Sequence, residues 1–249
     1  MKTMLVAMVL SIFCQHTTHA WQVDSTQHDS TGRGSKQRFI RRVSTRIHSI
    51  GFFNFSGRIC SNTPAIDFNL MGERNGYGVS VFAAKDLTDN YSANNFTFAI
   101  LHKRFAVSNR ITLTPSFGAV IDGLTHPPGD RVFLVSAFKA SSRLTIDETA
   151  LFANLLQRGE VKEWVNRIRF IYSQTNHIQF ILSSWHNNAV LDNSEYVSGS
   201  FQAGYNRIAL ADHLYLQTAV SFFVMAKNSD EVPLREKNGL LLTIGLSVE

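Results

Sequence analysis

The segment "ILSSWHNNAVLDN", residues 181–193, places a histidine beside two serines and two asparagines at the end of an apolar run. A serine hydrolase needs a histidine that removes the serine proton and a third group that orients the histidine ring. Ser184 and His186 share one face of a strand and lie about 7 Å apart, which is beyond direct hydrogen-bond reach. Asp192 and Glu195 are the nearby acids that could orient the ring. Ser184 and His186 are therefore the candidate catalytic pair, although their spacing favours a polar strand end without catalysis.

A second set of candidate functional residues consists of charged side chains that alternate with apolar neighbours. Asp67 and Glu73 do so in "PAIDFNLMGER", Arg167 and Arg169 do so in "EWVNRIRFIYS", and Glu148 is a weaker member of the set. Successive side chains of a strand point to opposite faces, so these charges face away from the apolar side chains. They predict either a static network of salt bridges that fills a narrow interior or the lining of a pore, and the residues alone leave both open.

No cofactor or metal is expected from the sequence. It contains no nucleotide-binding loop and no His/carboxylate spacing typical of a metal site. His177 and His186 fall on opposite faces of one strand, so they do not form a ligand pair. If the first twenty residues are removed on export, Cys60 is the one cysteine left, which excludes a disulfide framework within one chain.

Alternation with a period of two runs through most of the chain and predicts strands. In residues 194–205, "SEYVSGSFQAGY", apolar and aromatic residues alternate with serine and glutamine. The same pattern gives twelve candidate strands, near 47–57, 64–74, 76–85, 94–106, 110–122, 131–140, 143–155, 163–174, 177–186, 195–210, 214–226 and 239–248.

Short and long connections alternate between these strands. Asn75 and Gly76 form a two-residue hairpin signal, and short links follow near residues 107–109, 141–142, 175–176 and 211–213. Tight turns on one side and longer loops on the other are typical of a transmembrane barrel, which satisfies every backbone group by closure. The prediction is an all-β, transmembrane, up-and-down antiparallel β-barrel of about twelve strands. A soluble sandwich or lipocalin-like barrel is the alternative.

The amino-terminal region predicts export. Residues 1–20 contain Lys2, a ten-residue apolar core and a small-residue cleavage site, as in a signal peptide. Residues 21–46 form a basic extension that is expected to be disordered, with spacing over residues 37–47 that allows a short amphipathic helix. This extension supplies much of the net charge of +5, as a solvated tail or as a contact with anionic headgroups. The barrel is expected over residues 47–249.

From about residue 47 to residue 249, the strand pattern and the connections resemble Gram-negative outer-membrane β-barrel proteins. The resemblance implies a location in the outer membrane, with outer-membrane lipids and the barrel-assembly machinery as partners. Because the chain is expected to be exported, no nucleic-acid partner is expected. Such proteins usually end in an aromatic residue, whereas this chain ends in Ser247, Val248 and Glu249.

The same parity puts His186 on the outer wall at the long-loop end of its strand. Outer-membrane phospholipase A and the lipid A deacylases carry their active sites there, in a His-x-Ser-Asn sequence; here Asn188 occupies the serine position. The leading interpretation is a small channel or surface-loop scaffold without catalysis, whose solute or extracellular partner is unknown. The alternative is a membrane-embedded lipid hydrolase centred on His186, and a weaker one is a soluble periplasmic lipid-binding barrel.

Overall fold

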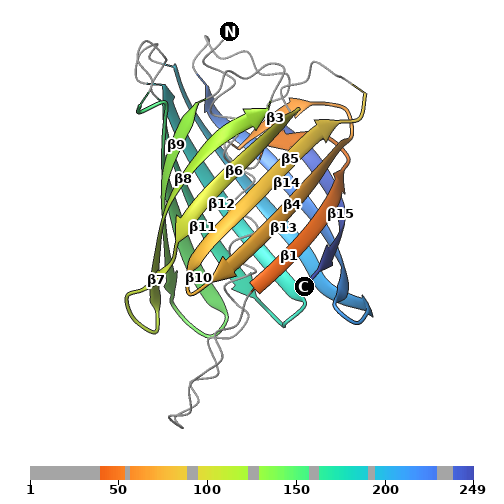
Figure 1. Cartoon of the computed structure of the whole chain (residues 1–249). Coiled ribbons are helices and arrows are strands. Elements are labelled where there is room, and N and C mark those ends of the chain that lie inside the picture. Colours follow the sequence, from red (N-terminus) through yellow and green to blue (C-terminus); the bar gives the residue numbers. More distant parts are fainter. Residues whose placement is uncertain are drawn as a thin grey trace.

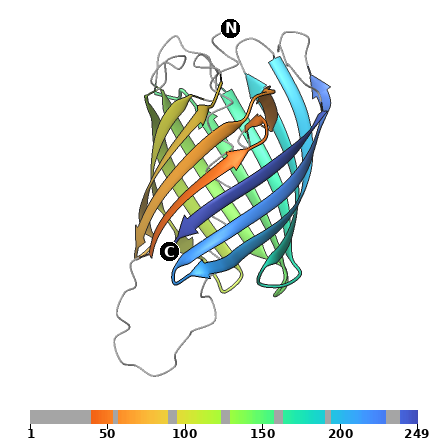
Figure 2. The same cartoon turned by 90° about the vertical axis from the view of Figure 1, so that its right-hand side faces the viewer.

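The computed structural model describes residues 40–53, 57–88, 95–122, 129–156, 163–189, 194–228 and 238–249. Within these residues, twelve antiparallel strands form a closed barrel (Figures 1 and 2). They are β1 (Ile40–His48), β4 (Ala65–Arg74), β5 (Tyr77–Asp86), β6 (Phe96–Lys103), β8 (Ile111–Asp122), β9 (Asp130–Lys139), β10 (Leu144–Ala153), β11 (Glu163–Ser173), β12 (Ile178–Ala189), β13 (Ser194–Ala211), β14 (Leu214–Asn228) and β15 (Asn238–Val248). The predicted fold class is confirmed.

Three short strands complete the described fold. β7 (Phe105–Ala106) follows β6 and pairs with β8, as β6 does. β2 (Gly51–Phe53) and β3 (Arg58–Ser61) pair only with each other, as a separate two-stranded sheet between β1 and β4 in the sequence.

The barrel closes where its first strand meets its last. β1 pairs with β4 on one side and with β15 on the other, from Val43 opposite Val248 to His48 opposite Thr243. At the short-turn end of this seam, the Glu249 carboxylate forms ion pairs with Arg42 and, at 3.0 Å, with Arg207. Charged side chains from β1 and β13 therefore hold the last residue of the chain in place.

The outer wall is apolar and exposed. On β15, for example, Leu240 is 58% exposed and Ile244 is 60% exposed, whereas Leu241 between them is buried. Val43, Phe68 and Phe170 likewise lie on the outside. A soluble lipid-binding barrel would place its apolar side chains inside, so this pattern favours the lipid-embedded barrel over that alternative.

The connections confirm the predicted alternation. Asn75 and Gly76 join β4 to β5 with φ of 57° and 77°, the left-handed conformations that a tight hairpin turn requires. The other short turns lie at the same end of the barrel, where β1 begins and β15 ends (Figure 1). The longer connections lie at the opposite end, which is called the long-loop end below.

The start of the barrel differs from its predicted position. The helix allowed over residues 37–47 is wrong from Ile40 onward, because these residues form β1. Val43 and Ile47 face outwards, and Arg42 and Arg46 are buried inside with acidic partners, so period two replaces the three- and four-residue spacing. The barrel thus includes residues 40–46, which the sequence assigned to the extension. The predicted signal peptide and residues 21–39 lie outside the described residues.

The described residues form no helix that is long and apolar enough to span a membrane.

Candidate functional site: the barrel interior

The inside of the barrel combines buried charges of both signs. Among the described residues, five arginines and four acidic residues are buried at inward positions: Arg42, Arg46, Arg131, Arg167, Arg169, Asp67, Glu73, Asp86 and Asp147. Charges that are removed from water must be paired to be tolerated. The contacts of Asp67, Glu73 and Asp147 show how this is achieved.

Asp67, on β4, is held by two residues of β1. Its carboxylate accepts hydrogen bonds from Arg46 Nε at 3.0 Å and Arg46 Nη2 at 2.5 Å, and His48 Nε2 lies 2.7 Å from Oδ2. The other ring nitrogen of His48 lies 2.9 Å from Thr243 Oγ1 on β15. This bidentate pair fixes Asp67 beside the closure seam.

Glu73, the second inward acid of β4, sits near the short-turn end. His102 Nε2 lies 3.3 Å from its carboxylate, and Arg104 forms an ion pair with it. Gly78 on the intervening strand makes room for the His102 ring, because a Cβ atom at position 78 would overlap that ring. Each inward acid of β4 is thus bound by one histidine and one arginine.

Asp147, on β10, is fully buried and shared by two arginines of β11. Arg169 donates to it from Nε at 2.8 Å and from Nη2 at 2.5 Å. Arg167 Nη2 lies 4.0 Å from Asp147 and donates to Thr149 Oγ1 at 3.1 Å. Two guanidinium groups of β11 therefore lie beside this one carboxylate of β10.

The predicted lumen-lining set divides into four inward residues and one outward residue. Asp67, Glu73, Arg167 and Arg169 are buried on the inner side. Glu148 is exposed on the outer wall, where it accepts a hydrogen bond from Asn166 Nδ2 at 2.8 Å, so its prediction as a lumen residue is wrong. Leu151, on the opposite face of the strand from Glu148, is buried on the inner wall, and the ladders on both sides of β10 are regular, so Asp147 points inwards and Glu148 outwards.

The inward charges pair with residues of neighbouring strands. Asp67 pairs with adjacent β1, Glu73 with the nearby β6 region, and Arg169 with adjacent β10. Adjacent strands are only about 4.8 Å apart, so a long arginine side chain reaches its neighbour more easily than the opposite wall. Arg46 and Asp147, which complete two of these contacts, were missed. Strict alternation in β1 and β10 is the signal that identifies them.

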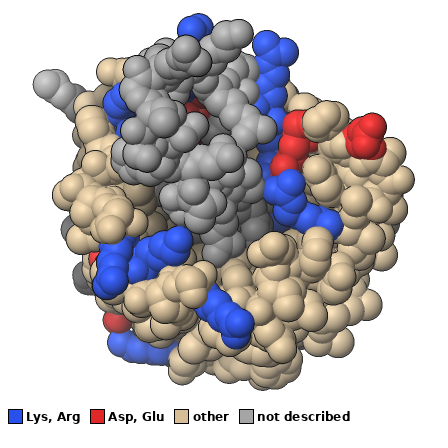
Figure 3. Space-filling model, turned by 90° about the horizontal axis from the view of Figure 1, so that it is seen from below, with Lys and Arg blue, Asp and Glu red and all other residues tan. Residues whose placement is uncertain are grey.

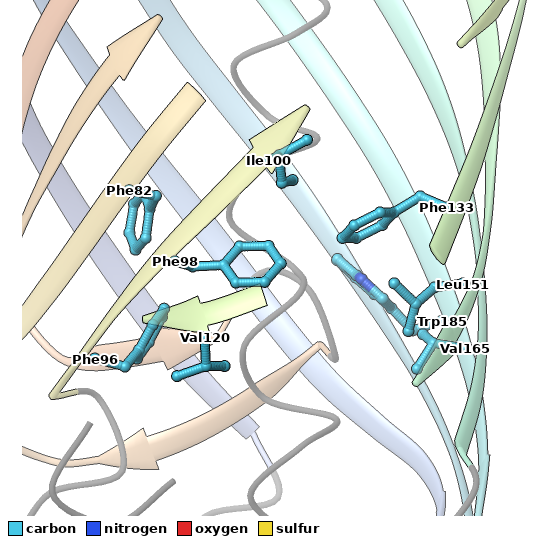
Figure 4. Packing of buried hydrophobic residues seen from close by; sticks show 9 residues of the cluster. All are labelled: Phe82, Phe96, Phe98, Ile100, Val120, Phe133, Leu151, Val165 and Trp185. Carbon is cyan, nitrogen blue, oxygen red and sulfur yellow. The ribbon is translucent and has the colours of Figure 1, made fainter. Parts of the chain in front are cut away.

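An apolar belt covers another part of the inner wall. It consists of Phe82, Phe96, Phe98, Ile100, Val120, Phe133, Leu151, Val165 and Trp185, which come from seven strands between β5 and β12 (Figure 4). Most of these residues lie in the half of their strand nearer the long-loop end. All are buried, so this half of the wall is packed and is not a water-exposed surface.

His186 lies on the outer wall, as the parity predicted. Its Nε2 is 3.0 Å from Glu195 Oε1, and its ring packs edge-on against Trp164 with centroids 5.3 Å apart. Glu195 in turn accepts a hydrogen bond from Lys227 Nζ at 2.7 Å. In the described part of the chain, no hydroxyl group is hydrogen-bonded to His186, and Ser184 lies two residues before it on the same outer face of β12. Glu195 therefore stands where the acid of a catalytic triad would, but among the described residues no hydroxyl group is hydrogen-bonded to His186 as a nucleophile.

We expect the His186 cluster to be catalytically silent. A His186→Ala protein should release no less fatty acid from phospholipid vesicles than the parent, because neither releases it above background. Ser184→Ala is the matched variant on the same face. Hydrolysis by the parent that both substitutions abolish would instead establish a lipid hydrolase.

No group of three or more His, Cys, Asp or Glu side chains in the described ranges is arranged to hold a metal ion.

The closed barrel, with its apolar outer wall and charged interior, has the fold of outer-membrane porins. Among solved structures, it is similar to the KdgM porin in complex with disordered oligogalacturonate, with a TM-score of 0.59 and 8% identity over 84% of this chain and 98% of that one. It is also similar to the NanC porin, with a TM-score of 0.57 and 10% identity over 84% of this chain and 100% of that one. No protein-family model matches the chain. No curated protein matches it significantly in sequence.

Proposed function

We propose that the chain is a non-catalytic outer-membrane protein that forms a narrow channel for small solutes. The observation that carries the proposal is the closed barrel with an apolar outside and an ion-paired inside. The proposal includes export by the amino-terminal segment, insertion by the barrel-assembly machinery and a coat of outer-membrane lipids around the outer wall. The similar folds of the KdgM and NanC porins support a channel more than a lipid hydrolase.

The channel is narrow because its inner side chains are packed. Eight strands leave an interior about wide enough for side chains, and sixteen to eighteen leave an aqueous channel. At twelve strands, the side chains decide the outcome, and here large inward residues such as Arg169, Trp185 and Tyr196 are almost completely buried. The same packing supports a second candidate function, a surface-loop scaffold that conducts no solute.

The channel prefers anions weakly. Two arginines share Asp147 on the inner wall. Viewed from the short-turn end, Lys and Arg side chains lie around the rim (Figure 3). Arg74, Arg110 and Arg143 are exposed residues in or beside the short turns. Positive charge along a pore and at its mouth raises the local anion concentration.

Purified protein in planar lipid bilayers tests this proposal. We expect small, discrete conductance steps with a reversal potential that indicates a modest anion preference in a salt gradient. A wide and unselective pore would contradict the packed interior. If the protein folds as a barrel but gives no conductance steps, the result would support the surface-loop scaffold function instead.

A further inference from the structure

The β2–β3 sheet belongs to the connection between β1 and β4, and both its ends are fixed to the barrel. On one side, Ser49 N donates to Leu242 O at 2.9 Å, and Leu242 N donates to Ser49 Oγ at 3.0 Å. On the other side, Thr63 Oγ1 donates to the Asp86 carboxylate, with distances of 2.8 and 2.7 Å to its two oxygens. Between these anchors, β2 and β3 pair with each other and leave the barrel wall.

Contacts of Gly57 and Ile59 place this sheet inside the barrel. A Cβ atom at Gly57 would lie 2.5 Å from Ser198 Oγ and 2.6 Å from Trp185 Cδ2, and both of these side chains are buried on the inner wall, on β13 and β12. Ile59 is also buried, and its Cδ1 occupies the space that a side chain at Gly239 of β15 would need. The sheet is therefore packed on the inner wall of β12–β15, near the long-loop end.

Two glycines make this close packing possible. Gly57 has a φ of 63°, a left-handed conformation that favours glycine, and it lies directly against the Trp185 ring. Gly239 pairs with Phe223, whose side chain is buried, so the absence of a side chain at position 239 leaves a recess for Ile59. Gly204 on β13, by contrast, has only ordinary van der Waals neighbours around its Cβ position.

We propose that the β2–β3 sheet is the constriction that sets the size limit of the channel. Packed sheets lie about 10 Å apart, and a barrel of twelve strands is much narrower than the aqueous sixteen-stranded channels. A sheet seated on one wall therefore occupies a large share of the lumen. This inference rests on the proposed channel function, but the position of the sheet can be tested without any measurement of conductance.

The position of the sheet can be tested with the double variant Ile59→Cys/Gly239→Cys, in which Cys14 and Cys60 are also replaced by serine. The measurement is whether a disulfide forms between residues 59 and 239. Ile59 Cγ1 lies 3.6 Å from the Cβ position of Gly239, which is close to the reach of a disulfide. Mass spectrometry of peptides after mild oxidation should show this crosslink. Ile59→Cys with Ser247→Cys is the control and should not crosslink, because Ser247 is buried on the same strand at the short-turn end.

The size-limit test compares Gly57→Ala with Gly204→Ala in planar bilayers. The new methyl group at position 57 meets the buried Trp185 ring and should displace the sheet, whereas the methyl group at position 204 should not. We expect Gly57→Ala to raise conductance about twofold or more, because the displaced sheet frees much of the roughly 10 Å that it occupied. We also expect it to admit larger uncharged polymers. Heat-dependent gel mobility verifies that both variants remain closed barrels.

The outcomes separate the two hypotheses. A folded protein that does not form the 59–239 disulfide places the sheet elsewhere and overturns the inference, even if channels are observed. A crosslinked protein with channels of equal size in the parent and in Gly57→Ala also overturns it. A crosslinked protein that gives no channel in any variant contradicts the proposed function, and the size limit with it.

Discussion

Replacing Arg167 and Arg169 together by serine should raise single-channel conductance and shift selectivity toward cations. Both guanidinium groups are buried inside the barrel beside Asp147, and serine removes their volume and their charge. The carboxylate of Asp147 is then left without these two cations, so passing cations replace anions as the favoured ions. We expect a conductance increase of about twofold, because charged side chains that line a narrow pore control both entry and selectivity. Reversal potentials in a salt gradient measure the shift.

Lys85→Ser provides the control for this experiment. Lys85 is an exposed residue of β5, so its loss removes a positive charge without changing the packed interior. Its conductance and reversal potential should equal those of the parent. Unchanged selectivity in the double arginine variant would show that these arginines do not line the path of the ions.

Asp147→Asn should destabilise the barrel strongly. The substitution leaves Arg167 and Arg169 buried beside each other without the carboxylate that accepts from Arg169 at 2.8 and 2.5 Å. Removing one partner of a buried ion pair costs about 3 kcal/mol or more, because the remaining charge stays out of water. The urea midpoint for unfolding from lipid bilayers should fall accordingly.

Two comparisons separate charge from packing in this experiment. Glu148→Gln changes the next residue of the same strand, which is exposed on the outer wall, and should alter stability by less than about 0.5 kcal/mol. Adding Arg167→Ser and Arg169→Ser to Asp147→Asn should recover most of the lost stability. A triple variant that is no more stable than Asp147→Asn would show that the loss came from packing.

Strand number and turn positions could be predicted from the sequence because both depend on local rules. Alternation assigns each residue of a strand to one wall, and Asn75 and Gly76 define a tight turn without knowledge of the rest of the barrel. The one misplaced lumen residue illustrates the same rule: Glu148 and Asp147 differ by one position, and Glu148 faces outwards because Leu151, on the opposite face, is buried on the inner wall.

Local sequence rules could not predict the partners of β1 or the position of the β2–β3 sheet. Alternation in β1 puts Arg42 and Arg46 on one face, but it does not show that Glu249 and Asp67 are their partners. The sheet is defined by Gly57 and Ile59 meeting strands far along the chain. Sequence spacing does not reveal such contacts between distant residues. Residues 47–57 were therefore predicted as one continuous strand, although they contain the end of β1 and the whole of β2.

The seam between β1 and β15 has a consequence for the order of folding. Arg42 and Glu249 are 207 positions apart, so the pairing that closes the barrel joins the two ends of the described chain. Contacts between distant residues form slowly, because a long loop must be closed before they are gained. Until β15 arrives, the free edge of β1 and the edge of the growing sheet both present unpaired backbone groups, which can pair with another chain. This protein is therefore most prone to aggregation between the formation of the first hairpin and the pairing of the last strand. A shortened chain without β15 would remain prone to aggregation, because the barrel could not close.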